Sequence, residues 1–373
     1  MEKIYTALGL MSGTSGDGVD ISIITSDGID QYSEILNKYF EYDQKTYQNL
    51  HNLRDLILKP DDIKKNEDKI KKLEREITLF HAKIVNVILE TIDQNIDFIG
   101  FHGQTIYHNP SEKISKQIGD GKLLSQLTKK TVIYNFRQND IKNGGEGAPL
   151  APIFHKLIVK QKKIEFPVCI LNIGGITNVT ALNENNNLLS KDLGPGNCLI
   201  DEWVRNNTKS KFDKNGEIAN RGKINKLILN QALDSFDNRP NQNNLSFDIK
   251  DFNLGFVRGL SLEDGLATLT DFTGRIIAEE LLNFLNKPKD KLWKVLVCGG
   301  GRKNTTLLES IKKKISRNMV IQIIDDHGVD GDYVESQAFA YLAIRSYLKL
   351  PISFPSTTGC QEPCTGGEIV KNF

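Results

Sequence analysis

A short apolar run that meets a glycine-rich turn and returns as a second apolar run occurs twice in this chain. The first copy comprises residues 5–10, the turn 11–18 and residues 19–25. The second comprises residues 168–173, the turn 174–178 and residues 179–182. This pattern predicts a β-hairpin, because glycine accepts the backbone angles that a tight turn needs. Two such hairpins far apart in one chain indicate a duplicated domain.

The rest of the chain predicts alternating helices and strands, and therefore an α/β fold. Ile70, Leu73 and Ile77 begin an apolar series at spacings of three and four that predicts an amphipathic helix. Because 373 residues exceed what one hydrophobic core usually supports, we expect two domains. They are an N-terminal lobe of residues 1–145, with residues 340–373 packing back on it, and a C-terminal lobe of residues 146–339. Residues 215–253, rich in Asn, Asp and Lys, suggest a mobile excursion or a loosely packed lid.

Charge and hydropathy exclude several classes of protein. Lys and Arg number 48 against 47 Asp and Glu, so the net charge of +1 predicts no nucleic acid partner. Apolar runs fall well short of the roughly 20 residues that a membrane span needs, and no cleavable leader is evident, so we expect a cytoplasmic protein without a membrane partner. Cys360 and Cys364 have three residues between them and no further ligands at zinc-site spacing, so the sequence predicts no metal site there.

Three glycine-rich turns, at residues 12–18, 174–178 and 299–304, each follow an apolar run. Backbone N–H groups in such a turn can approach an anion closely, because glycine has no Cβ. One such turn is most often an ordinary tight turn, but three together favour phosphate binding. Neither GxxxxGK[ST] nor a GxGxxG that opens a helix occurs, so phosphate would be held by the hairpin turns.

Several motifs carry a resemblance that runs in order along nearly the whole chain. They are MSGTS at 11–15, DGVD at 17–20, HGQT at 102–105, NFR at 135–137, GGEGAPL at 144–150, NIGGI at 172–176, GPGN at 194–197 and GVDGDYVESQAF at 328–339. Together they resemble the anhydro-N-acetylmuramic acid kinase family, within the superfamily of sugar kinases, actin and chaperone ATPases. The resemblance implies two duplicated ribonuclease-H-like domains with a nucleotide cleft between them.

The resemblance also implies a reaction, part of bacterial cell-wall recycling. ATP, water and 1,6-anhydro-N-acetylmuramic acid would give ADP and N-acetylmuramic acid 6-phosphate. Water attack at the anomeric carbon needs a general base, for which a carboxylate is the usual group. Asp192 corresponds to the base of the family. On its position alone, Asp192 could instead accept hydrogen bonds from the glycine turn that follows.

For the nucleotide, the resemblance implies ATP with Mg²⁺ between its phosphates. Asp17 or Asp20 would hold the waters of the metal, because Mg²⁺ needs few protein carboxylates; either could instead cap the turn. The nucleotide-binding candidates are Gly13, Thr14, Ser15, Gly16, Asp17, Gly18, Val19 and Asp20, then Gly174 and Gly175, then Gly299, Gly300, Gly301 and Asn304.

For the sugar, Arg137 can form a bidentate pair with the lactyl carboxylate of a muramic acid. The motifs of His102 and Glu335 resemble substrate-contacting segments of the family. Each residue also has a simpler alternative. Arg137 could form an ordinary surface ion pair, His102 could be a structural histidine, and Glu335 could be a carboxylate in the first turn of a helix. The family tendency to dimerise also makes a homodimer an expectation.

Four features depart from the family pattern. Gly16 stands where Leu is usual, Leu193 replaces Thr, Asn135 replaces Asp, and residues 239–247 lack an expected Lys-Ser-Thr-Gly-Arg-Glu run. Altered flanks leave two alternatives open. One is a kinase for another amino sugar that phosphorylates a hydroxyl directly, and the other is an ATP-binding regulator without sugar-dependent turnover.

Overall fold

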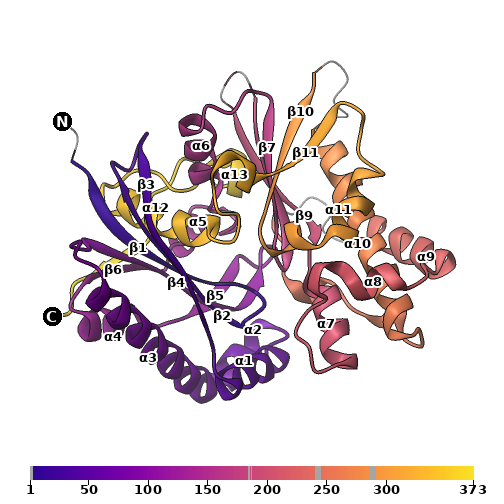
Figure 1. Ribbon diagram of the computed structural model, residues 1–373. Helices are drawn as coiled ribbons and strands as arrows, with labels where there is room; N and C mark the ends of the chain where they lie inside the picture. Colours follow the sequence, from indigo (N-terminus) through magenta and orange to yellow (C-terminus); the bar gives the residue numbers. More distant parts are fainter. Residues whose placement is uncertain (1–2, 184, 186, 240–244, 286–290) are drawn as a thin grey trace. The chain divides into compact units, whose positions relative to one another are not determined.

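The chain forms two compact units, each with one β-sheet and helices packed on it (Figure 1). The computed structural model describes residues 3–183, 185, 187–239, 245–285 and 291–373. The first unit is Met1–Ile164 with Tyr333–Phe373, and the second is Glu165–Asp332. Residues 146–164 and 333–339, expected in the C-terminal lobe, thus lie in the first unit. The α/β class predicted from the sequence is confirmed.

The sheet of the first unit begins with a three-stranded antiparallel meander and continues with parallel strands. The order is β3-β2-β1-β4-β6-β12, with β5 paired to β4. Strand β1 pairs antiparallel with β2 and parallel with β4, and β4 pairs parallel with β6. The strands are β1 Tyr5–Ser12, β2 Gly18–Ser26, β3 Tyr32–Glu41, β4 Phe98–Asn109, β5 Ile114–Ile118, β6 Thr131–Tyr134 and β12 Glu368–Val370.

The second unit repeats this pattern. Its sheet has the order β9-β8-β7-β10-β11, in which β7, β8 and β9 form the antiparallel meander and β10 and β11 run parallel to β7. The strands are β7 Val168–Ile173, β8 Ile176–Leu182, β9 Leu188–Pro195, β10 Trp293–Cys298 and β11 Met319–Ile323. Because five strands pair in the same way in both units, the predicted duplication of a ribonuclease-H-like domain is confirmed.

Helix α12 (Val334–Tyr347) lies directly on the sheet of the first unit. A Cβ on Gly9 would come within 1.9 Å of the Ser336 carbonyl oxygen, and a Cβ on Gly100 within 2.2 Å of that of Phe339. Glycine on β1 and β4 therefore lets the helix backbone approach. Successive strand residues face opposite sides, so Leu8 and its neighbours at alternate positions pack on the other face, against helix α3 (Glu67–Thr91).

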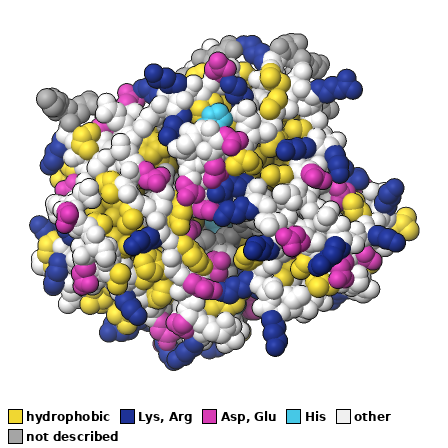
Figure 2. Space-filling view, viewed as in Figure 1, with side chains coloured by type: hydrophobic (Ala, Val, Ile, Leu, Met, Phe, Trp, Pro, Cys, Tyr) yellow, Lys and Arg dark blue, Asp and Glu magenta, His cyan; other side chains and the backbone are white. Residues whose placement is uncertain are grey.

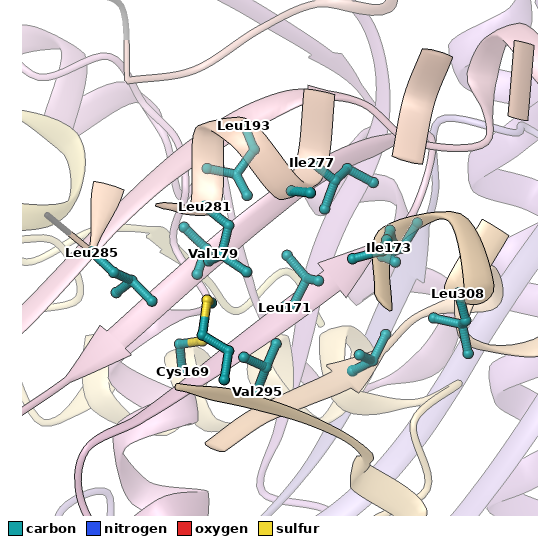
Figure 3. Close-up of a cluster of buried hydrophobic side chains, with 14 of the residues drawn as sticks. Cys169, Leu171, Ile173, Val179, Leu193, Ile277, Leu281, Leu285, Val295 and Leu308 are labelled. Atoms are coloured by element: carbon teal, nitrogen blue, oxygen red, sulfur yellow. The ribbon is translucent and has the colours of Figure 1, made fainter. Parts of the chain in front are cut away.

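The core of the second unit lies between its sheet and helices α10 (Leu262–Phe284) and α11 (Thr305–Lys312). Cys169, Leu171 and Ile173 alternate along β7 and point into this core (Figure 3). Leu193, expected to be Thr on the resemblance noted above, is fully buried in the same cluster. That departure therefore contributes apolar packing.

The remaining helices complete the two units. They are α1 Gln44–Leu56, α2 Pro60–Lys65, α4 Gly121–Thr128, α5 Gln138–Lys142, α6 Pro152–Gln161, α7 Cys198–Asn207, α8 Glu217–Arg221, α9 Lys226–Asp237 and α13 Pro355–Thr358; short 3₁₀ turns are at Lys214–Gly216, Ile249–Asp251, Gly255–Val257, Gly300–Lys303 and Ile324–His327. Where the sequence suggested a loose lid at 215–253, α8 and α9 instead pack with α7 and α10 around a cluster that includes Trp203 and Leu229. Residues 240–244 lie outside the described part of the chain.

On the face drawn in Figure 2, basic and acidic side chains are interspersed among the described residues. This distribution agrees with the net charge of +1. In the described part of the chain, none of the helices combines the length and apolar character that crossing a membrane would require.

Candidate functional site

The first glycine turn, between β1 and β2, is held from two sides by buried groups. Arg54 of α1, only 4% exposed, donates from Nη1 to the Thr14 carbonyl oxygen at 2.6 Å and from Nε and Nη2 to that of Thr105 on β4. Gln104 donates from Nε2 to the Gly13 carbonyl oxygen at 3.0 Å. The turn is therefore fixed to β4, and its carbonyl groups are already engaged inside the protein.

Gly16 has a left-handed backbone with φ of +64°, and a Cβ there would come within 2.7 Å of Leu50. The Leu that the resemblance leads one to expect here would not fit this conformation without strain. A Cβ on Gly13, in contrast, would meet only Ser15 Oγ at 3.8 Å. Backbone conformation and packing inside the protein therefore explain why residue 16 is glycine. No such packing surrounds Gly13, which has open space beside it.

Carboxylates gather where this turn enters β2. Ser15 Oγ donates to Asp17 Oδ1 at 2.6 Å. Burial chiefly raises the pKa of the Tyr39 hydroxyl, and the charges of Asp17, Glu41 and Asp20 raise it further. These carboxylates thus lie around one phenol, and hard oxygen donors of this kind fit Mg²⁺.

The second turn, between β7 and β8, is joined to the segment after β9. The Gly175 carbonyl oxygen accepts from the N–H groups of Gly196 and Cys198, and that of Gly174 accepts from the Asn197 N–H at 2.8 Å. A Cβ on Gly174 would meet nothing nearer than the Ile176 carbonyl oxygen at 3.5 Å. The side of Gly174 where a Cβ would lie is therefore open, as at Gly13.

The third turn packs beside the second. Gly299 has φ of +77°, and a Cβ on it would lie 2.4 Å from Asn172 Oδ1, while one on Gly301 would lie 2.2 Å from Ile173. Gly300 has nothing nearer than Asn197 Nδ2 at 4.0 Å. Only the middle glycine of the three therefore faces open space.

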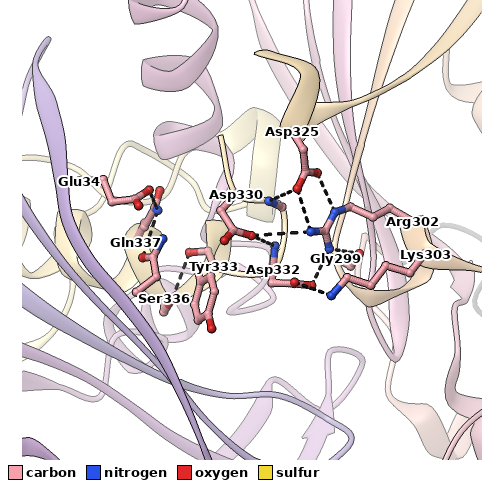
Figure 4. A network of polar contacts seen from close by, with 12 residues as sticks. Glu34, Gly299, Arg302, Lys303, Asp325, Asp330, Asp332, Tyr333, Ser336 and Gln337 are labelled. Atoms are coloured by element: carbon pink, nitrogen blue, oxygen red, sulfur yellow. Dashed lines mark hydrogen bonds and ion pairs between the residues drawn. The ribbon is translucent and has the colours of Figure 1, made fainter. Parts of the chain in front are cut away.

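Arg302 anchors the third turn through three aspartates (Figure 4). Its guanidinium pairs bidentately with Asp325 at 2.7 and 2.9 Å, donates to Asp332 Oδ1 at 2.5 Å and lies 3.6 Å from Asp330 Oδ1. The same group donates to the Gly299 carbonyl oxygen at 3.2 Å. Burial opposes the charges of Asp325 and Asp332, but the hydrogen bonds from Arg302 outweigh it and keep the pKa of both carboxyls below the usual value. The network fixes the turn from behind.

Asn304, one of the predicted nucleotide-binding residues, caps helix α11. Its Oδ1 accepts the Leu307 N–H at 3.0 Å, and a Cβ on Gly216 would lie 2.2 Å from that oxygen. The side chain is 6% exposed. Asn304 therefore has a structural role as a helix N-cap, whatever else it contacts.

Asp192 lies on β9, two residues before Gly194, and is 6% exposed. Its Oδ2 accepts the Phe247 N–H at 2.9 Å, and its own N–H donates to the Leu245 carbonyl oxygen at 2.8 Å. The described end of the segment that departs from the family pattern thus holds the carboxylate directly. Of the same segment, Arg239 stacks on Phe236 with its guanidinium carbon 3.6 Å from the ring centroid.

His102 and Arg137 form a pair in the first unit. Arg137 donates from Nη2 to His102 Nε2 at 3.0 Å and from Nη1 to the Gly147 carbonyl oxygen at 2.9 Å. Burial, followed by the charge of Arg137, holds the pKa of His102 well below its ordinary value, so the ring is neutral at neutral pH. Because Nε2 accepts, Nδ1 carries the proton and donates to the Gly103 carbonyl oxygen at 2.8 Å.

These groups share the α12 face of the sheet with other predicted site residues. His102 alternates with Gly100 on β4 and stacks on Phe339 of α12 at 4.5 Å between ring centroids. Asp20 alternates with Ser22, which hydrogen-bonds Ser336 of α12 at 2.7 Å. Glu335 is in the first turn of the same helix.

Sequence reasoning missed the anchoring role of Arg302 in the third turn and three further residues that hold the turns. Gln104 and Asn197 stand in the HGQT and GPGN motifs, so the motifs themselves offered a signal. Arg54 lies near the end of helix α1 and belongs to no local motif. Its role depends on a contact between α1 and the turn that no local pattern encodes.

Two ribonuclease-H-like units, each beginning with a hairpin whose glycine turn leaves open space, define the class of two-domain phosphotransferases and ATPases that includes the sugar kinases. Comparison with known proteins narrows this class. A family model described as anhydro-N-acetylmuramic acid kinase matches residues 5–372. The chain belongs to this family, and it is therefore a kinase.

Individual relatives of the chain carry the name of the same family. The anhydro-N-acetylmuramic acid kinase of Pelagibacter ubique (strain HTCC1062) is 60% identical over 375 residues, covering 100% of both chains. That of Zymomonas mobilis subsp. mobilis is 38% identical over 371 residues, covering 97% of this chain and 99% of its own. Among solved structures, a ROK family glucokinase from Streptomyces griseus in complex with glucose and AMPPNP is 11% identical, with a TM-score of 0.40 over 91% of this chain and 99% of that chain.

Proposed function

We propose that this kinase uses ATP and water to convert 1,6-anhydro-N-acetylmuramic acid into N-acetylmuramic acid 6-phosphate and ADP. The two relatives described above carry the name of this activity. The observation that carries the proposal is the position of Asp192, a nearly buried carboxylate on the strand that leads into the Gly194–Gly196 segment bonded to the second turn.

Asp192 acts as the general base in this proposal. It takes a proton from a water molecule, whose oxygen bonds to the anomeric carbon while the bond from that carbon to O6 breaks. The released O6 attacks the γ-phosphorus, and ADP leaves. Phosphoryl transfer captures the leaving oxygen, so no second carboxyl group has to protonate it.

The phosphates would contact the backbone of the turns at Gly13 and Gly174, and the nucleoside that of the turn at Gly300; at these three glycines a Cβ would have no close neighbour. The remaining nucleotide candidates flank these three glycines. Mg²⁺, when bound, neutralises charge on the β- and γ-phosphates, and Asp17 and Asp20 would hold it through water.

We expect Gly13→Ala and Gly174→Ala to raise the KM for ATP about tenfold or more, because a methyl group would keep a phosphate oxygen from the turn amides. The free energy of unfolding should change by less than about 1 kcal/mol, since the Cβ meets no close neighbour. Steady-state kinetics and thermal denaturation followed by circular dichroism measure both effects.

Gly9→Ala is the matched control, because its methyl would lie 1.9 Å from the Ser336 carbonyl oxygen. That variant should lose more than about 2 kcal/mol of stability. Should Gly13→Ala and Gly174→Ala destabilise the chain as strongly while KM for ATP stays unchanged, the turns would be structural only.

Arg137 is proposed to bind the lactyl carboxylate, with His102 orienting its guanidinium and Glu335 contacting the sugar. The neutral His102 ring supports this arrangement, because it accepts from Arg137 without adding a like charge. Arg137 keeps its positive charge for a carboxylate ligand.

Arg137→Ala should raise the KM for the sugar about 10- to 100-fold, the loss expected for a charge-assisted hydrogen bond, and leave the KM for ATP nearly unchanged. Initial rates at varied sugar and varied ATP separate the two constants. Arg75→Ala, which removes an exposed arginine of α3, is the control and should change neither. An equal rise in both constants would make Arg137 a structural residue.

Mass spectrometry of the sugar product formed in ¹⁸O-labelled water tests the proposed reaction. The product should carry one phosphoryl group and one labelled oxygen at the anomeric position, beyond what unlabelled product gains in the same water. A phosphorylated product that keeps the anhydro bridge would identify a kinase that phosphorylates a hydroxyl directly. Nucleotide binding without sugar-dependent ADP release would identify a regulator.

Four further expectations stay predictions. They are a nucleotide cleft between the two units, a homodimer, the absence of a nucleic acid partner, and a cytoplasmic location in the recycling of cell-wall sugar. A role in the recycling of cell-wall sugar would follow from the proposed substrate.

A further inference from the structure

Three buried side chains of metal-binding type meet in the first unit, where the C-terminal segment packs against α5. Asp140 of α5, Cys360 and Cys364 each offer one ligand atom, and these atoms all lie within 4.8 Å of one another. The residues are 1%, 2% and 5% exposed. In the described ranges of the chain, this is the one group of three such side chains.

We propose that Asp140, Cys360 and Cys364 bind one thiophilic divalent cation, of which Zn²⁺ is the biological example. The cation would link the segment after α13 to α5. The spacing of the two cysteines could not indicate this site, because the third ligand comes from a distant part of the sequence.

The type and spacing of the donor atoms fit this cation. Sulfur prefers Zn²⁺ to the hard cations Mg²⁺ and Ca²⁺, and Zn²⁺ also accepts a carboxylate oxygen. With Zn–S near 2.3 Å and Zn–O near 2.1 Å, tetrahedral ligand atoms lie roughly 3.5–3.8 Å apart. The three atoms here, within 4.8 Å of one another, need only a small inward shift. A water molecule would complete the fourth position.

The charge of the buried cluster stays the same when the cation binds. Without a cation, both thiols carry protons, and Cys364 Sγ donates to the Glu362 carbonyl oxygen at 3.0 Å. One divalent cation takes the place of two thiol protons, which pass to solvent, so the net charge of the cluster does not change. Binding therefore adds no uncompensated charge to the interior.

Asp140 is already positioned to act as a ligand. Its Oδ2 accepts the Gly147 N–H at 2.7 Å and its Oδ1 accepts the Thr358 hydroxyl at 2.6 Å. Each carboxylate oxygen has a second lone pair, so these bonds leave acceptor capacity for a cation. Bonds of this kind fix the direction of a metal ligand before the metal arrives.

The alternative for two adjacent thiols is a disulfide, formed when an oxidant such as glutathione disulfide takes two electrons and the two protons leave. A disulfide is neutral and gains nothing from a carboxylate beside it. The carboxylate of Asp140 within reach of both sulfurs therefore favours the cation.

A cation here would also act on the predicted sugar site. Gly147, whose N–H donates to Asp140, offers its carbonyl oxygen to Arg137. The C-terminal segment is bound to the same loop, since the Gln361 N–H donates to the Asn143 carbonyl oxygen at 3.0 Å. The cation would thus restrain the loop that orients Arg137.

Zinc binding by the full-length protein tests the proposal. The chain is reduced, stripped with a chelator, dialysed against a small excess of Zn²⁺ and analysed by plasma mass spectrometry. We expect about one tightly held zinc per chain, and less than about a tenth of that in Cys360→Ser and in Cys364→Ser. Cys169→Ala, at a buried cysteine in the core of the other unit, is the matched control and should retain the metal.

Cobalt gives an independent signature. The protein loaded with Co²⁺ should show a sulfur-to-cobalt charge-transfer band in the near ultraviolet, present in Cys169→Ala and absent in both serine variants. Circular dichroism checks that the variants remain folded, and Asp140→Asn should weaken zinc affinity about tenfold or more.

Three outcomes would overturn the proposal. One is that the wild-type chain holds no more zinc than the variant lacking both Cys360 and Cys364. Another is that Cys360→Ser and Cys364→Ser keep a full equivalent, which would mean that the zinc is bound elsewhere. The third is that protein prepared without reductant carries a Cys360–Cys364 disulfide and the reduced chain binds no zinc.

Discussion

Replacing Asp192 by asparagine is expected to lower kcat by about 10²- to 10⁴-fold, the usual contribution of a positioned general base. An amide cannot take the proton from the attacking water. It has the same shape, and its oxygen can still accept the Phe247 N–H that Asp192 Oδ2 accepts at 2.9 Å. KM for ATP should therefore stay nearly unchanged. Initial rates of sugar-dependent ADP release measure the loss.

The fold of the variant can be monitored in the same unit. The two tryptophans of the chain, Trp203 and Trp293, both lie in the second unit, so their fluorescence during urea unfolding reports on the domain of Asp192. Asp234→Asn, at an exposed carboxylate of α9, is the control and should keep full activity. Turnover of Asp192→Asn within tenfold of the wild type would remove Asp192 from the role of base.

Local patterns were sufficient to predict the two hairpins and the long helices. The hairpins consist of apolar runs around glycine, and their strands pair with neighbours close in sequence. The third strand of the first meander, β3, was not predicted, because only Tyr32 of its residues is buried and its apolar alternation is weak. An edge strand with many charged side chains gives little signal.

The prediction of a mobile or loosely packed segment at residues 215–253, which was based on composition, is wrong. Asparagine there suggested a loop, yet Asn225 caps α9 by accepting the Ile228 N–H at 3.2 Å. Leu229, Ala232 and Phe236 follow at helical spacing and are buried. Asparagine is a favoured residue at a helix N-cap, so its presence marked the start of a helix.

Most of the site features that could not be predicted from the sequence depend on contacts between distant segments. Motifs identified the glycine turns, but not that Arg54 fixes the first of them or that Arg302 fixes the third. Each contact depends on tertiary packing, which brings a long cationic side chain under a turn. For the same reason, the spacing of Cys360 and Cys364 gave no indication that Asp140 lies beside them.

Replacing Arg302 by methionine is expected to destabilise the second unit by about 2 kcal/mol and to raise the KM for ATP. Breaking a fully buried ion pair costs about 3–5 kcal/mol, because the remaining charges lose their partner. The carboxylates of Asp325 and Asp332 keep 39% and 32% exposure, so water screens part of that loss. The Gly299 carbonyl oxygen would lose its donor, so the third turn would no longer be held in place, and the KM for ATP should rise. Urea unfolding followed by tryptophan fluorescence, together with kinetics at varied ATP, measures both effects.

The acid dependence of this stability separates the ion network from simple packing. Asp325 and Asp332 have pKa values below 3.8 in the folded chain, so their contribution is present above the unfolded value and is lost as pH falls through the folded values. The difference between wild type and Arg302→Met should therefore be full at pH 7 and shrink below about pH 4. Lys303→Met, which removes an exposed partner of Asp332, should cost less than about 1 kcal/mol. A difference between wild type and Arg302→Met that is constant with pH would mean that the alkyl chain of Arg302, rather than its charge, holds the turn.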